Sequence, residues 1–279
     1  MTSKKWMLIA VLAFCALAIS VKEIGDQINS FQIIFFRSLF GLVVLLPFVK
    51  QRLTKVDFAS LKRHGVRNLF HLIGQYGWIV GIVYLPLAEV TAIEFSVPVW
   101  VLIIATIFLK EKLNSSKVLS VGLGFIGVLL VLKPGFKAIS SESIIVLLSA
   151  VCYGIAHVST KKIVQTNSPF DVVFIMCLIQ SPIALCFSFK NWGSPTVLDS
   201  FWMAMVGLMA IVAHFSLAKA IQVKDISSVI SMDYLRLPIL IVVGILIYNE
   251  PFELFLLLGG SIIFFASYLN KILSQNLTE

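Results

Sequence analysis

One apolar segment, residues 88–113, limits what this chain can fold into, because it is long, nearly free of charge and yet contains a carboxylate. Its sequence is AEVTAIEFSVPVWVLIIATIFLKEKL, with Glu94 and Pro98 inside the apolar part and a charged end at Lys110, Glu111 and Lys112. At about 1.5 Å per residue, the apolar part is long enough to cross a hydrocarbon core of about 30 Å. A carboxylate in such a segment normally faces a cavity or a partner group rather than lipid.

The same layout recurs in residues 227–252, where Asp233, Pro238 and Glu250 occur in the same order. Glu94 and Asp233 are 139 residues apart, and Glu111 and Glu250 are separated by the same number. This spacing predicts a duplicated membrane protein whose working residues centre on the two acids.

The overall composition agrees with a membrane protein. Of the 279 residues, 59% are hydrophobic and 13% are charged, whereas soluble domains carry about 25% charged residues. The net charge of +8 does not indicate nucleic acid, because the basic residues lie in short segments between apolar runs. We therefore expect a lipid bilayer and a small-molecule substrate as partners.

The four cysteines give no sign of a metal site or of disulfide bonds. None lies in a CxxC or CxxH spacing, and all fall in apolar runs. We expect no metal ion and no cofactor.

Ten apolar spans can be placed along the chain. They cover residues 5–21, 29–49, 67–85, 89–109, 117–133, 143–160, 170–189, 198–218, 226–248 and 252–270. The first span resembles a signal peptide, but we expect it to be retained because it has a counterpart in the second half.

The distribution of lysine and arginine between the predicted loops sets the orientation. With the N-terminus inside, sixteen basic residues fall on the inner side and four on the outer side. By the positive-inside rule, both termini are expected in the cytoplasm, in a multi-pass protein of the cell inner (plasma) membrane.

A comparison of the chain with itself at the 139-residue offset supports two repeats, residues 1–137 and 138–279. FQIIFFRSLFGLVVLLPF aligns with FDVVFIMCLIQSPIALCF without a gap, and Gln75 aligns with His214. Each half holds five spans, an odd number, so the second half enters the bilayer inverted. The predicted fold is all-α: ten transmembrane helices in two inverted five-helix repeats, an arrangement typical of secondary transporters.

Several motifs resemble the EamA branch of the drug/metabolite transporter superfamily. They are FFRSLFGLVVLLP, with Arg37 in the second span, then SVPVW followed by FLKEKL, GFIGVLLVLKPG, and VISMDYLRLP with YNEP in the second half. The resemblance implies ten helices, cytoplasmic termini and a central cavity lined by helices 1, 3, 4, 6, 8 and 9. The end of the first half is also similar to bacterial S-adenosylmethionine uptake carriers within that branch.

Polar residues within the spans are the candidates for a substrate site. His71, Gln75 and Trp78 share one helical face, and so do Ser149, Tyr153 and His157. The candidate substrate-binding residues are Arg37, His71, Gln75, Trp78, Glu94, Tyr153, His157, His214, Asp233 and Arg236. Two acids and two arginines balance in charge, which favours a zwitterionic or amphoteric metabolite.

The charged residues have two interpretations. Asp233 with Arg236, and Glu94 with Arg37, could be ion pairs that only hold helices together, or they could contact substrate or a proton. Because no cation lies within four residues of Glu94 on its own helix, Glu94 is the candidate for proton coupling by alternating access.

Other functional classes have less support. An intramembrane enzyme is disfavoured because HExxH and GxSxG are absent from the sequence, and a channel is disfavoured because two unequal halves do not supply a ring of equivalent polar groups. Small residues at Gly122, Gly124 and Gly127, and again at 259–261, favour close helix contact and are candidates for a homodimer interface.

Overall fold

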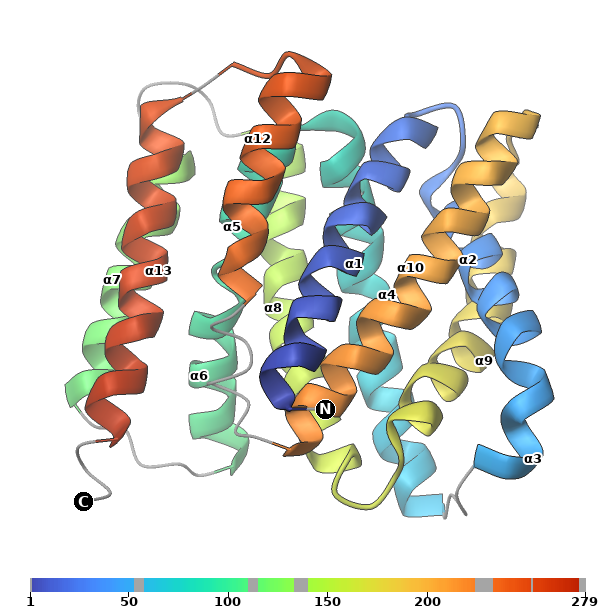
Figure 1. The fold of residues 1–279 in the computed structure, drawn as a ribbon, viewed down its shortest axis with the longest axis horizontal. Helices are drawn as coiled ribbons and strands as arrows, with labels where there is room; N and C mark the ends of the chain where they lie inside the picture. The colour runs from blue at the N-terminus through green and yellow to red at the C-terminus, as the bar shows by residue number, and fades with distance from the viewer. Residues whose placement is uncertain are drawn as a thin grey trace.

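The computed structural model describes residues 2–52, 58–109, 115–132, 140–223, 233–251 and 253–275, and these residues form a helical bundle without strands (Figure 1). The α-helices are α1 (Ser3–Ile24), α2 (Ser30–Leu45), α3 (Val49–Arg52), α4 (Phe58–Tyr84), α5 (Leu87–Glu94), α6 (Val97–Leu109), α7 (Ser115–Leu132), α8 (Ser141–Ile163), α9 (Pro169–Ser188), α10 (Val197–Val223), α12 (Arg236–Tyr248) and α13 (Leu254–Gln275). Short 3-10 helices are η1 (Leu46–Phe48), η2 (Phe189–Asn191) and η3 (Asp233–Leu235).

The helices confirm an α-helical membrane fold. Within the described ranges, six stretches are long and apolar enough to cross a membrane: Ser3–Ile24, Ser30–Gln51, Leu87–Phe108, Ser141–Ile163, Pro169–Asn191 and Val197–Gln222. Helices α4, α7, α12 and α13 lie at the other four predicted positions, and ten crossings remain the predicted number. Large hydrophobic side chains on the outside, such as Leu12, Val43 and Leu246, suit contact with lipid.

Four prominent helix pairs each take one member from either half of the chain. They are α1 with α10, α4 with α8, α2 with α9, and α7 with α13. In Figure 1, α7 and α13 stand at one side, α2 and α9 at the other, and the remaining two pairs between them. The two halves therefore interleave in one bundle, and their apolar faces form a shared core.

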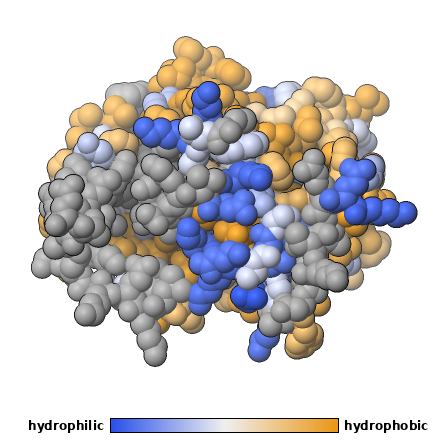
Figure 2. All heavy atoms as spheres, turned by 60° about the horizontal axis from the view of Figure 1, so that its bottom comes forward, coloured by the Kyte–Doolittle hydropathy of each residue, from blue (hydrophilic) through white to orange (hydrophobic). Residues whose placement is uncertain are grey.

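Helix direction follows the predicted inversion. Helix α1 starts at the bottom of Figure 1 and ends at the top, whereas α8, which opens the second half, ends at the bottom. Helix α13 also ends at the bottom, so the first and last helices of the bundle reach the same face. Figure 2 shows hydrophilic residues gathered in the middle of that face, with hydrophobic residues around them.

The span that carries Glu94 is broken, and the sequence explains the break. Helix α5 ends at Glu94 and α6 begins at Val97. Pro98 has no backbone N–H, and its ring clashes with the carbonyl of the residue four positions earlier, which is Glu94. The first hydrogen bonds of α6 start instead from the carbonyl of Ser96, which accepts from the backbone nitrogens of Val99 and Trp100. The break places Glu94 at a helix end within the bundle.

Small residues permit close packing inside the chain. A Cβ atom added at Gly124 would collide with Val99 of α6, and one added at Gly260 would collide with Leu237 of α12. At these two positions the small residues serve contacts within one molecule. The homodimer interface stays a prediction.

Candidate functional site

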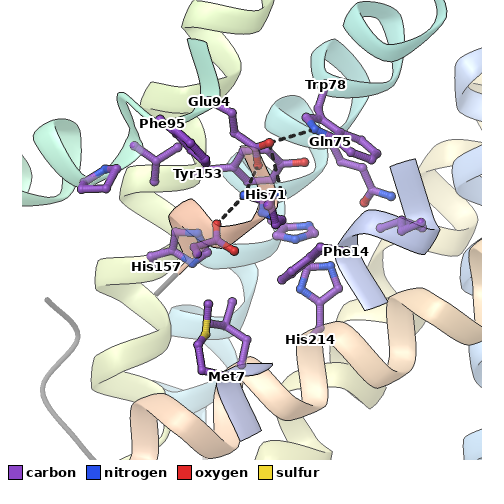
Figure 3. Close-up of a pocket in the computed structure, with 16 residues that line it drawn as sticks. Met7, Phe14, His71, Gln75, Trp78, Glu94, Phe95, Tyr153, His157 and His214 are labelled. Carbon is purple, nitrogen blue, oxygen red and sulfur yellow. Dashed lines mark hydrogen bonds and ion pairs between the residues drawn. The ribbon is translucent and has the colours of Figure 1, made fainter. Parts of the chain in front are cut away.

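A cavity in the middle of the bundle collects the charged residues of the broken spans (Figure 3). Its lining comes from α1, α4, the α5–α6 break, α8, α10 and the η3–α12 segment, which are the predicted helices 1, 3, 4, 6, 8 and 9. The lining residues are Met7, Phe14, Leu17, His71, Gln75, Trp78, Glu94, Phe95, Val97, Pro98, Tyr153, His157, His214, Leu217, Asp233 and Arg236.

Ten of these sixteen residues form pairs related by the 139-residue offset, so the cavity lies between equivalent parts of the two halves. The pairs are Phe14 with Tyr153, Gln75 with His214, Trp78 with Leu217, Glu94 with Asp233, and Val97 with Arg236. This is the position at which inverted-repeat transporters hold their substrate sites.

The centre of the site is Arg236, which contacts both acids at once. Its Nη1 donates to Glu94 Oε2 at 3.2 Å, and its Nη2 lies 3.2 Å from Glu94 Oε1. Its Nη2 also donates to Asp233 Oδ2, one helical turn away. The guanidinium is buried, with 4% of the residue exposed, and lies over the ring of Phe14 with Cζ 5.1 Å from the centroid. Such planar, two-pronged pairing suits arginine better than lysine.

Two further contacts orient Glu94. Trp78 Nε1 donates to Glu94 Oε2 at 3.1 Å, and the helix break gives the side chain its position at the end of α5. The carboxylate is therefore fixed by groups from α4 and α12, which belong to different halves of the chain.

The predicted ion pair between Glu94 and Arg37 is not formed. Arg37 instead donates from Nη1 to Gln75 Oε1 at 2.6 Å and to Gln180 Oε1 at 3.2 Å. The cation at Glu94 comes from Arg236, because the inverted packing brings α12 against α5. The sequence of its own helix suggests that Glu94 is isolated from positive charge, but Arg236 contacts it. The two acids therefore share one cation.

A chain of aromatic rings forms the remaining wall. Phe14 packs on His214 with centroids 5.3 Å apart, His214 on His71 at 4.8 Å, and His71 on Tyr153 at 5.5 Å. Tyr153 then stacks near His157 at 6.3 Å. These rings come from α1, α10, α4 and α8, so the candidate histidines meet across helices that are distant in sequence.

Most of the predicted site residues lie together. The cavity contains every candidate except Arg37, which lies behind Gln75. Ser149, on the same helical face as Tyr153 and His157, packs beside Gly77 and donates to the carbonyl of Ile145. Glu111 and Lys110 lie outside the described residues.

The sequence interpretation missed Phe14 and Gln180. Phe14 lies 139 residues before Tyr153, so the offset could have identified it. Gln180 is an amide in the middle of an otherwise apolar run, a signal of an internal polar contact.

This fold and cavity define a two-repeat helical membrane transporter. The chain belongs to the EamA-like transporter family, whose family model matches residues 3–133 and again residues 140–271. Because this is a family of transporters, the chain is a transporter and not an enzyme.

Known relatives cover most of the chain. It is 28% identical over 250 residues to the S-adenosylmethionine uptake transporter of Rickettsia bellii, spanning 88% of this chain and 84% of the relative. It is 24% identical to the riboflavin transporter of Rhizobium johnstonii, spanning 94% and 88%. A solved crystal structure superposes with a TM-score of 0.73 over 99% of both chains at 15% identity, which shows a shared fold.

Proposed function

We propose that this transporter is a secondary carrier for a small zwitterionic metabolite, working by alternating access, and that S-adenosylmethionine is the substrate that fits best. The observation that carries this proposal is the Glu94–Arg236–Asp233 cluster in a cavity lined by repeat-related pairs. A site between inverted halves can face either side of the membrane in turn, because the halves exchange roles.

The charge of the cluster favours a substrate with surplus positive charge. Among the side chains that line the cavity, two carboxylates and one guanidinium leave one net negative charge, while Arg37 lies behind the lining. S-adenosylmethionine is an amino acid with an added sulfonium, so it carries one net positive charge beside its zwitterionic group. The similarity to S-adenosylmethionine uptake transporters supports the same substrate. A neutral amino acid is the alternative within the same class.

A closed contact on one side of the bundle supports alternating access. Both carboxylate oxygens of Glu250 accept from the backbone nitrogen of Leu87, at 2.9 and 3.0 Å, and so cap the start of α5. Lys22 Nζ lies 3.9 Å from Glu250 Oε1, and Tyr248 donates to Glu23 at 2.7 Å. We name this set of contacts the Glu250 latch. It joins the end of α12, in the second half, to α1 and α5 in the first.

The proposed orientation places the Glu250 latch on the outer side. The repeats, residues 1–137 and 138–279, are inverted, and both termini lie in the cytoplasm of a cell whose inner membrane holds the protein. The loop distribution of basic residues supports this, as does the polar face at the bottom of Figure 1, which α1 and α13 reach.

Glu94 is the proposed proton-binding group. Protonation of its carboxylate removes the attraction to Arg236 and leaves that guanidinium with Asp233. Competition between a proton, Arg236 and a cationic substrate for the same carboxylate would then connect substrate movement to the proton gradient.

The test is transport in proteoliposomes with labelled S-adenosylmethionine. We expect saturable uptake that is accelerated by unlabelled S-adenosylmethionine inside, and competition by methionine that exceeds competition by riboflavin. Uptake that neither saturates nor responds to internal substrate contradicts a carrier mechanism. Strong competition by riboflavin alone contradicts the zwitterionic substrate.

A further inference from the structure

Arg37 is a buried cation with neutral partners. It is 1% exposed and contacts Gln75 Oε1, Gln180 Oε1 and the sulfur of Met176, the last at 3.5 Å. Among the described residues, no carboxylate lies within ion-pair distance of it. An uncompensated charge inside a membrane protein is costly, so its presence points to an anionic or strongly accepting group nearby at some stage of the cycle.

The hydrogen bonds of Arg37 fix the orientation of one neighbouring side chain after another. Since Gln180 Oε1 accepts from Arg37, Gln180 Nε2 must be the donor at the other end of the amide. This nitrogen lies 3.3 Å from the carbonyl oxygen of Asn68 and 3.0 Å from His71 Nδ1. His71 Nδ1 is therefore an acceptor, and the neutral ring carries its hydrogen on Nε2.

The hydrogen on His71 Nε2 has no acceptor in the described part of the chain. The atom is buried and without a hydrogen-bond partner there, although His71 lines the cavity. An unmade hydrogen bond of a buried donor is unfavourable. This buried donor would therefore gain a hydrogen bond from a bound molecule whose acceptor reaches it.

Gln75 presents a second donor on the same helical face. Its Oε1 accepts from Arg37, which leaves its Nε2 to donate elsewhere, and Gln75 lines the cavity one turn after His71 (Figure 3). Together His71 and Gln75 supply two N–H donors with the positive charge of Arg37 behind them. Carboxylates accept such paired donors well, because both oxygens can be hydrogen-bonded.

The part of the cavity formed by α5 and η3 has the opposite character. Ionised Glu94 and Asp233 can only accept hydrogen bonds, and Asp233 Oδ1 is a buried oxygen without a partner among the described residues. The cavity thus has a donor side and an acceptor side.

From this asymmetry we propose that His71 and Gln75 bind the carboxylate of the substrate, oriented by Arg37 directly and through Gln180, while Glu94 and Asp233 receive its cationic end. This assignment rests on the proposed function and fixes which end of the zwitterion each side recognises. Arg37 and Gln180 are positioning residues, and Arg236 remains the partner of the two acids.

The experiment compares matched ligands that differ only by a carboxylate, using the purified full chain. One pair is S-adenosylmethionine and its decarboxylated form, and the second is methionine and 3-(methylthio)propylamine. Binding is measured by titration in detergent or nanodiscs. For at least one pair, we expect the zwitterion to bind tenfold or more tighter than its decarboxylated partner.

Variants then show which residues cause the preference for the ligand that carries a carboxylate. His71→Phe and Gln75→Leu each remove a donor, and Gln180→Leu removes the group that orients His71. Each should reduce the preference for the zwitterion by tenfold or more while the affinity for the decarboxylated ligand changes less than threefold. Gln180→Asn, which keeps the amide, should retain more of the preference than Gln180→Leu. Gln222→Leu, at an exposed glutamine, is the matched control and should leave the preference unchanged.

The outcomes separate the two proposals. If neither zwitterion binds the native protein, the proposed function is overturned, and this assignment with it. If a zwitterion binds and its decarboxylated partner binds equally well, the function stands and the assignment is overturned. A preference that persists in His71→Phe and Gln75→Leu also overturns it. Should one variant fail to insert, the other and the native ligand comparison decide.

Discussion

Lys22 and Lys161, which the 139-residue offset relates, make the same kind of contact at opposite ends of the bundle. Lys22 Nζ donates to the carbonyl of Leu85, just after α4, at 2.7 Å, and Lys161 Nζ donates to the carbonyl of Ile221, in the last turn of α10, at 3.2 Å. A positive charge at a helix C-terminus is stabilising. Because α1 and α8 end on opposite faces of the bundle (Figure 1), the two lysines mark equivalent positions at its two ends.

The latch prediction concerns access from the outer side. We expect Glu250→Ala to weaken the contact between α12 and α5, because Leu87 loses its acceptor and Lys22 loses its counter-charge. The measurement is labelling of Leu17→Cys, in the cavity, by an impermeant maleimide added outside, with the four native cysteines replaced by alanine. Labelling should become several times faster. Glu142→Ala is the control, and an unchanged rate in Glu250→Ala means that the contact does not limit access.

The site prediction concerns Glu94→Gln. The amide retains nearly the same shape but loses the charge that attracts Arg236, so S-adenosylmethionine uptake should fall tenfold or more at near-normal abundance in the membrane. Asp26→Asn, at an exposed position, should leave uptake unchanged. Degradation of the Glu94→Gln protein before insertion indicates a structural role, and normal uptake at normal abundance removes Glu94 from the site.

The stability prediction concerns Arg236→Gln. Two partly buried carboxylates then lose their shared cation. Breaking a fully buried ion pair costs about 3–5 kcal/mol, and the partial exposure of the two acids lowers that cost. The thermal unfolding temperature of the purified protein should fall clearly. Adding Glu94→Gln and Asp233→Asn to the same variant should restore most of the loss, because no unpaired charge remains. A triple variant as unstable as the single one shows that packing of Arg236, including that on Phe14, matters more than charge.

The coupling prediction concerns an imposed pH difference across proteoliposomes. If Glu94 carries the proton, native flux should change with the pH difference, whereas the reduced flux that remains in Glu94→Gln should not depend on it. Native flux that ignores the pH difference excludes proton coupling and leaves facilitated diffusion or exchange.

The topology prediction follows from the loop distribution of basic residues. Reporter fusions at both termini should report a cytoplasmic location, and a fusion after Lys137, which lies outside the described residues, should report an external one. If the N-terminal fusion reports a cytoplasmic location and the C-terminal fusion an external one, the number of crossings is odd and a span has been miscounted.

The sequence by itself determined the class of fold and most of the site. Apolar run length, the low share of charged residues and the fixed 139-residue offset are local or one-dimensional properties, and they require no knowledge of packing. Pro98 likewise determines where the fourth span breaks, because its effect on the carbonyl of Glu94 is local. The periodicity of α4 correctly placed His71, Gln75 and Trp78 on the cavity face.

Only the tertiary structure decided which charges meet. Arg37 and Arg236 are both arginines within spans, and their neighbours in sequence do not distinguish a partner of Glu94 from a partner of Gln180. That choice depends on which helices of the two inverted halves touch: α12 packs on α5, whereas α2 packs on α9. Contacts between residues 142 or 143 positions apart follow from this packing, so the sharing of Arg236 by two acids and the orientation of His71 emerge only when the halves interleave.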